Sequence, residues 1–191
     1  EQLVALALLA LTQLLARGVT TAEVKSGYGL DAEAELRTLR AIAALSKAQP
    51  VELVATFLGL HAVPPEIKER REAWVRLCVD ELLPRIVGEQ LASACDAFIE
   101  QSAFTHDEAR RLAAKAKALG LPLRLHVDQL TANGGAQLAA ELGAVSADHL
   151  EQISAAGIAA MKQRGTIAVL APTSTLFARA KPYAPGRALR D

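Results

Sequence analysis

The stretch that decides the fold is Leu123-Arg124-Leu125-His126-Val127-Asp128-Gln129, a short apolar run that ends in a histidine and then a carboxylate. Leu121-Pro122 ends the helical pattern before it, and residues 131–135 after it have the composition of a loop. This pattern is typical of a buried parallel strand, and α/β proteins place reactive groups at the carboxyl ends of such strands. By itself the stretch favours a half-buried histidine that is hydrogen-bonded at a strand end.

The composition of the 191-residue chain favours repeated strand–helix units. Apolar residues make up 51% of the sequence but aromatic residues only 4%, so Ala, Leu and Val must fill the core. The chain has 21 basic and 21 acidic residues. This balance gives no electrostatic footprint for binding a nucleic acid or an anionic membrane.

The cysteines and the amino-terminal residues point to a soluble protein of the cytoplasm. Cys78 and Cys95 lie in apolar helical patterns, which favours buried thiols over a disulfide or a cysteine-based zinc site. No apolar run approaches the ~20 residues of a spanning helix. Residues 1–16 lack the basic region and cleavage site of a secretory leader.

Periodicity, caps and breakers predict six strands that alternate with helices. The predicted strands are residues 19–24, 51–60, 97–100, 123–127, 144–149 and 166–170. The predicted helices are residues 2–16, 31–48, 66–91 with breaks at Pro84 and Gly88, 105–119, 135–142 and 154–163, and residues 187–191 begin another. Asp31 can cap the second helix, and Thr105 with Glu108 has capping-box spacing.

Two parallel architectures fit this alternation: a doubly wound open sheet and a (β/α)8 barrel of the TIM type. Neither the G-x-G-x-x-G nor the G-x-x-x-x-G-K-[ST] fingerprint of nucleotide-binding folds is present. Polar residues instead lie at or just beyond the carboxyl end of each predicted strand: Lys25, His61, Glu100, His126, His149 and Thr173. A ring of polar groups at the carboxyl ends of the strands favours the α/β barrel.

Three of the four histidines end predicted strands. An imidazole there can bind a metal ion or transfer protons near neutral pH. His126 and His149 lie one strand–helix unit apart and are expected to be neighbours, whereas His106 opens a helix and is expected at the surface. A metal site needs three or more protein ligands, so these two histidines alone do not complete one.

Five motifs resemble the imidazolonepropionase family of the amidohydrolase superfamily. They are Glu23–Leu30, Phe57–Pro64, Leu125–Leu130, Val145–Glu151 and Gly165–Leu170. They follow the family order and cover nearly all of the chain. The resemblance implies hydrolysis of the lactam C–N bond of 4-imidazolone-5-propanoate to N-formimidoyl-L-glutamate in histidine degradation. It also implies a homodimer with one zinc or iron ion per subunit.

The resemblance assigns roles to individual residues. It implies that His126 is a metal ligand and that His149 transfers protons to and from the attacking water and the ring. Tyr28 and His61 are expected to contact the imidazolone. For Lys25 a contact with the substrate and a solvated strand-end cation are both open.

Three carboxylates and an amide have open roles. Glu100 is either a substrate-side carboxylate or a salt-bridge partner. Asp128 and Gln129, which follow the proposed metal ligand, are candidates for proton transfer, and the orientation of Asp128 is open. Asp148 is expected to point to the opposite face of its strand from the neighbouring histidine and to be structural.

The sequence departs from the family in two places. The family opens its barrel with a His-x-His pair and supplies a ligand aspartate from its last strand, and this sequence has no His-x-His. We therefore expect residues 1–191 to be a partial barrel domain with strands two to seven of eight. The first and last strands and the family's β-sandwich would be absent, as in an internal fragment that is inactive in isolation.

Two alternatives remain at the level of the sequence. One is another hydrolase of the amidohydrolase superfamily, such as a cyclic amidase or a heterocycle aminohydrolase. The other is a metal-free α/β binding scaffold whose strand-end histidines are incidental.

Overall fold

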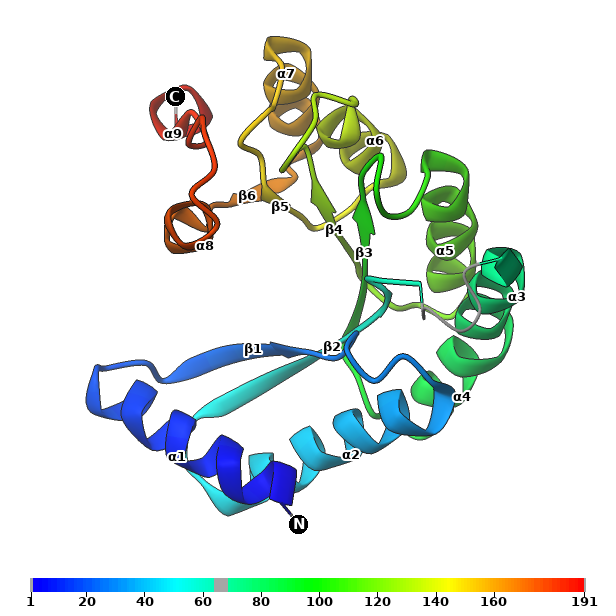
Figure 1. Ribbon diagram of the computed structural model, residues 1–191, viewed down its shortest axis with the longest axis vertical. Coiled ribbons are helices and arrows are strands. Elements are labelled where there is room, and N and C mark those ends of the chain that lie inside the picture. Colours follow the sequence, from blue (N-terminus) through cyan, green and yellow to red (C-terminus); the bar gives the residue numbers. More distant parts are fainter. Residues whose placement is uncertain (1, 64–68, 191) are drawn as a thin grey trace. The chain divides into compact units, whose positions relative to one another are not determined.

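The computed structural model describes residues 2–63 and 69–190 (Figure 1). The strands are β1 (Thr21–Lys25), β2 (Glu52–Leu60), β3 (Ala94–Ile99), β4 (Leu123–Val127), β5 (Ser146–His149) and β6 (Ile167–Val169). They follow chain order in the sheet, and β1–β2, β4–β5 and β5–β6 pair in parallel. Sequential parallel strands joined by helices are the topology of consecutive (β/α)8-barrel units, which confirms the expected α/β class.

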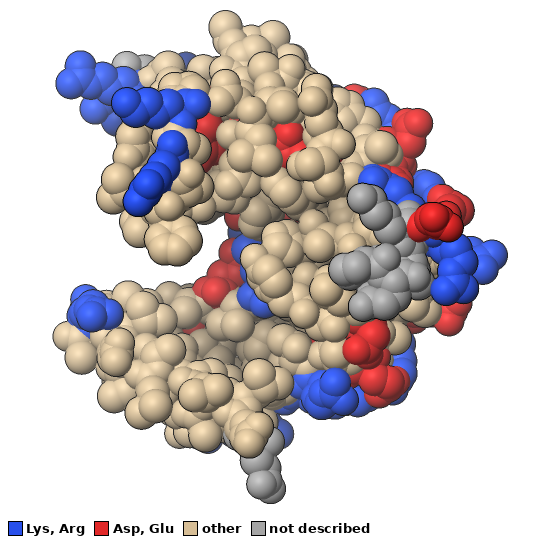
Figure 2. Space-filling view, viewed as in Figure 1, with Lys and Arg blue, Asp and Glu red and all other residues tan. Residues whose placement is uncertain are grey.

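The helices match the predicted ones closely. They are α1 (Gln2–Ala16), α2 (Ala32–Ala48), α3 (Arg71–Arg76), η2 (Leu77–Leu82), α4 (Leu83–Gly88), α5 (His106–Ala118), α6 (Gly135–Leu142), α7 (Ala155–Arg164), α8 (Pro172–Phe177) and α9 (Gly186–Arg190). Among the described residues none of them has the length and apolar character that crossing a membrane requires. Toward the right of the face shown in Figure 2, acidic and basic side chains are interspersed, whereas the charged side chains at its upper left are basic.

The chain divides into two compact units at the Cys95–Asp96 bond, within β3. In the first unit α1 and α2 lie on the same side of β1 and β2 (Figure 1). A small core of Leu11, Leu45 and Val51 joins the two helices to the start of β2. The side chain of Asp31 accepts a hydrogen bond from the Ala34 amide and caps α2 as predicted.

The predicted break at Pro84 is wrong. Helix α3 continues through the π-helical segment η2 into α4, where Pro84 occupies the first turn. Because proline lacks an N–H, the wider hydrogen-bond register of a π turn before it lets the helix continue. Gly88 ends α4 as expected. The predicted helix start at Glu66 lies outside the described residues.

In the second unit α5, α6 and α7 lie on one side of β4 and β5 (Figure 1). The capping box of Thr105 and Glu108 opens α5 as predicted. Strand β3 begins three residues earlier than predicted and ends at Ile99, so that it includes Asp96. Helix α8 was not predicted; the proline at its amino-terminal turn lacks only an N–H that no helical carbonyl would accept there.

Candidate active site

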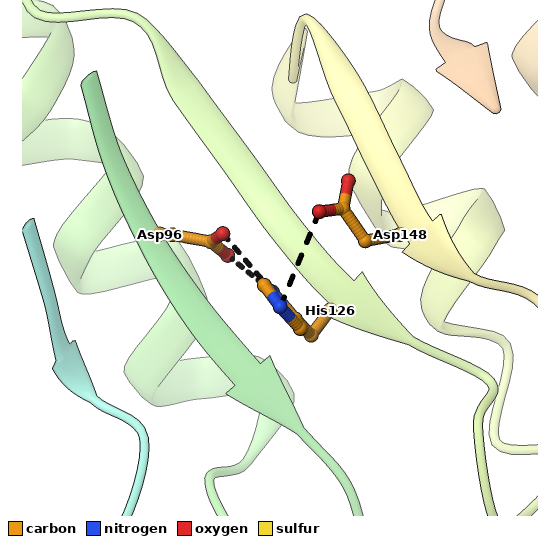
Figure 3. Close-up of side chains that lie close together, drawn as sticks. All are labelled: Asp96, His126 and Asp148. Carbon is orange, nitrogen blue, oxygen red and sulfur yellow. Dashed lines mark hydrogen bonds and ion pairs between the residues drawn. The ribbon is translucent and has the colours of Figure 1, made fainter. Parts of the chain in front are cut away.

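Strands β3, β4 and β5 place Asp96, His126 and Asp148 side by side (Figure 3). His126 lies opposite Asp148 in the β4–β5 register, and such cross-strand neighbours project from the same face. One ligand atom from each of the three side chains lies within 4.8 Å of the others. Both carboxylates are buried, with 1% of Asp96 and 6% of Asp148 exposed. The three side chains therefore form one polar cluster, and the Ser146 hydroxyl, which accepts a hydrogen bond from Arg124 at 3.2 Å, donates one to Oδ1 of Asp148 at 3.1 Å.

The imidazole of His126 lies between the two carboxylates, as Figure 3 shows. Its Nδ1 is 3.0 Å from each oxygen of Asp96, and its Nε2 is 4.0 Å from Oδ2 of Asp148. A histidine whose Nδ1–H is held by a carboxylate presents the Nε2 lone pair, which is the arrangement that orients metal-ligating histidines. Asp96 therefore fixes the ring, and Nε2 faces Asp148.

Asp96 is the cluster residue that sequence analysis missed. The third strand was predicted to begin at residue 97, which left Asp96 in a connection. The available signal was a single carboxylate within the apolar run Ala94–Ile99. A charged residue in a buried strand is costly unless it is paired, and such residues often mark a functional site.

Asp148 and His149 were expected to point to opposite faces of their strand, which would place only one of them near His126. In the structure both side chains approach His126. Regular pleating ends at the end of β5: φ is +82° at His149 and +68° at Leu150. Left-handed backbone of this kind redirects the side chain and costs free energy in a non-glycine residue. The ring centroids of His126 and His149 consequently lie 5.2 Å apart.

The surroundings of His149 favour its neutral form. Burial lowers its pKa below the ordinary histidine value, and the neighbouring His126 lowers that pKa further, while Glu151, Asp148 and Asp96 oppose the shift. Nδ1 of His149 is buried and has no hydrogen-bond partner in the described part of the chain; Oε1 of Glu151 is 3.8 Å away. A neutral imidazole that faces a polar cluster can accept a proton near neutral pH.

The donor set of this cluster fits a divalent metal ion. Imidazole nitrogen and carboxylate oxygen are ligands that zinc and iron both accept. The buried, converging carboxylates would also benefit from a positive charge, because burying like charges together is unfavourable. The sequence predicts His126 as a metal ligand; the structure places Asp148 beside it as a further candidate donor and Asp96 against Nδ1 of its ring.

Glu100 and Asp128, the candidate carboxylates that follow β3 and β4, accept hydrogen bonds from nearby backbone amides. Glu100 is 3% exposed and accepts hydrogen bonds from the amides of Leu130 and Thr131 at 2.8 and 3.2 Å and from the Thr131 hydroxyl at 2.5 Å. Asp128 is 1% exposed, and its two oxygens accept the amides of Gly135 and Ala136 at the start of α6. Carboxylates stabilise helix amino termini in this way.

Gln129 has a different environment from these carboxylates. Its side chain lies in the loop directly after Asp128 and is half-buried.

In the first unit, the loop after β1 brings Tyr28 against His61. Their ring centroids are 4.6 Å apart, with planes inclined by 65°. Tyr28 is 81% exposed, so one ring face remains open to solvent. Lys25, at the end of β1, forms an ion pair with Glu23 at 3.0 Å. The structure thus brings together the two residues expected to contact the ring of a substrate.

Comparison with curated proteins gives specific relatives, although no family model matches the chain. It is 57% identical over 191 residues to an imidazolonepropionase from Myxococcus xanthus, which covers 100% of this chain and 45% of that protein. It is 50% identical over 175 residues to one from Erwinia tasmaniensis, which covers 92% and 43%. The chain matches the imidazolonepropionases along its whole length. It spans less than half the length of these two relatives.

Solved structures show the same fold at low sequence identity. An adenosine deaminase from Xanthomonas campestris with bound zinc has a TM-score of 0.62 and 19% identity, over 95% of this chain and 42% of that one. An amidohydrolase has a TM-score of 0.57 and 16% identity, over 92% and 49%. The family resemblance and the fold inferred from the sequence are both confirmed.

Proposed function

We propose that this chain carries part of the active site of an imidazolonepropionase. The reaction is hydrolysis of the lactam C–N bond of 4-imidazolone-5-propanoate to N-formimidoyl-L-glutamate. The observation that carries the proposal is the buried cluster of Asp96, His126 and Asp148 with His149 beside it, in a chain 57% identical to a relative of that name. The six strands would then correspond to strands two to seven of an eight-stranded barrel.

The ion of this site would be zinc or iron, held by His126 Nε2 with Asp148 as a second donor. A divalent ion bound there would supply Lewis acidity that makes a coordinated water acidic at neutral pH. Asp96 contributes by holding Nδ1 of His126 at 3.0 Å, which keeps the imidazole in the tautomer that presents Nε2.

His149 is the proposed proton-transfer residue. Its lowered pKa keeps the imidazole neutral at physiological pH, so that it can accept a proton from the attacking water. Once protonated it can deliver that proton to the ring nitrogen that leaves when the lactam opens. The neighbouring carboxylates Glu151 and Asp148 would stabilise the transient imidazolium.

Tyr28 and His61 are proposed to contact the imidazolone ring, with Lys25 as a further substrate-side group. Gln129 could donate a hydrogen bond from its amide. The geometry favours structural roles for Glu100 and Asp128, because the oxygens of both are occupied by backbone amides. The homodimer is a proposal that rests on the resemblance, and the cytoplasmic location is a proposal that rests on the cysteine and amino-terminal patterns.

A chimera tests the proposal. This chain would replace the aligned segment, 45% of the Myxococcus xanthus relative, and the loss of imidazolonepropionate absorbance would be followed. We expect turnover by the chimera, loss of turnover in a His149→Gln variant, and a stoichiometric divalent metal. We expect no turnover by the isolated chain. A metal-loaded, folded chimera without activity would refute the proposal, and a metal-free one would favour a binding scaffold.

A further inference from the structure

We infer that Glu35 is a positioning residue that locks the loop after β1 and thereby fixes Tyr28 against His61. The inference deepens the proposed function, since it concerns the residues proposed to bind the substrate. It rests on a buried carboxylate that accepts hydrogen bonds from the two backbone amides on either side of Tyr28.

Glu35 lies in the first turn of α2 and is completely buried. Its Oε2 accepts the Gly27 amide at 2.8 Å, and its Oε1 accepts the Gly29 amide at 2.7 Å. Two amides that converge on one carboxylate form a small anion-binding nest, which here is filled by the protein's own side chain. Hydrogen bonds to a charged acceptor are among the strongest in proteins, particularly where water is excluded.

The two glycines let the loop reach this carboxylate. A Cβ on Gly27, where φ is +113°, would lie 2.5 Å from the Leu58 carbonyl oxygen. A Cβ on Gly29 would lie 2.7 Å from the Glu35 nitrogen and 2.8 Å from the carbonyl carbon of Ala34. The loop is thus packed between the end of β2 and the start of α2, and only residues without side chains fit at these two points.

The residue between these glycines carries the functional consequence. Tyr28 is 81% exposed, so burial does not hold its ring. Glycine neighbours give the backbone on both sides unusual conformational freedom. The bonds to Glu35 remove that freedom, and the ring then rests edge-on against His61 at 4.6 Å. Fixing the pair before the substrate arrives reduces the entropy lost on binding.

Two further interactions involve the loop and Glu35. The Ser26 hydroxyl, 2% exposed, accepts the Leu58 amide at 3.2 Å and ties the loop to β2. Cys78 in the π-helical segment η2 lies close enough to Glu35 that the carboxylate charge adds to burial in raising the pKa of the thiol. Cys78 is therefore a neutral thiol beside the carboxylate.

The test compares Glu35→Gln with Glu33→Gln, a matched substitution two residues earlier in the same helix turn. Glu33 is an apt control because its side chain is 63% exposed and binds Arg85, away from the loop. Glutamine keeps the volume of Glu35 but loses its charge and opposes one amide with an NH2 group. We expect amide exchange of residues 26–30 to accelerate by about tenfold, as for one lost hydrogen bond. Exchange in α4, which lies in the same unit as Glu35, is the internal reference for unfolding of that unit.

Two readouts separate positioning from a purely structural role. The nuclear Overhauser contact between the Tyr28 and His61 rings should be lost in Glu35→Gln and kept in Glu33→Gln; the chain has only 2 tyrosines, which simplifies assignment. In the active chimera, KM should rise about tenfold while kcat changes less than about twofold, because His126 and His149 are untouched.

Unchanged loop exchange, a persistent ring contact, or a loosened loop with unchanged KM would each overturn the inference. An inactive parent chimera would refute the proposed function, while the exchange and ring-contact data would still decide whether Glu35 positions Tyr28. If Glu35→Gln also accelerates exchange in α4, Gly29→Ala replaces it. That substitution pushes the loop away from Glu35 and should give the same loop exchange and the same lost ring contact.

Discussion

The role assigned to Asp96 makes the most direct prediction about the metal site. Asp96→Asn preserves the size of the side chain and a hydrogen-bond acceptor but removes the charge that holds Nδ1 of His126 at 3.0 Å. Loss of such an orienting carboxylate lowers metal affinity by about 10- to 100-fold, or roughly 1.4 to 2.8 kcal/mol. The wild-type pairing is buried, with Asp96 only 1% exposed, so solvent does not compensate for the loss.

The assay is competition for zinc between the chimera and a chromophoric chelator at pH 7.5, with the chimera at a fixed concentration. Asp107→Asn is the control, because this aspartate lies in the exposed first turn of α5 and should leave affinity unchanged. Asp148→Asn should weaken binding at least as much as Asp96→Asn, since Asp148 faces Nε2. Wild-type affinity in Asp96→Asn would show that Asp96 does not orient the ligand.

Three further outcomes follow from the same contacts. Because the pKa of His149 is lowered in the folded state, the unfolded state binds the proton more readily. The free energy of unfolding should therefore be fully retained above the ordinary histidine pKa and should fall as the pH drops below it. Urea unfolding at pH 8 and 5.5 should show a smaller fall in this free energy for His149→Gln than for the wild type. Thr175→Val removes the donor that bonds Glu151 at 2.5 Å and should cost about 1–3 kcal/mol in urea unfolding, whereas Thr175→Ser should retain most stability. Gly135→Ala places a Cβ 2.6 Å from Cβ of Val127 and should cost about 1–3 kcal/mol by overpacking; an unchanged melting temperature would contradict this packing.

Much of the fold follows from local chemistry that is legible in the sequence. Asp31 caps α2, and Thr105 with Glu108 caps α5, because the side chains of these residues satisfy amides only a few positions away. The strand that contains His126 was bounded correctly by apolar residues and by flanking breakers. Pro84 misled the prediction, because whether a π turn accommodates a proline depends on how the surrounding helix packs.

The sequence by itself determined the alternation of strands and helices, the family resemblance, and the placing of His61, His126 and His149 at strand ends. It also placed Tyr28 in the loop after the first strand. Only the tertiary structure showed that Asp96 holds His126, that left-handed backbone at His149 turns its ring toward the cluster, and that Glu35 clamps the Tyr28 loop. The physical reason is the range of the interactions. Caps and periodicity act within a few residues, whereas Asp96 and His126 are 30 positions apart and meet only because their strands are neighbours.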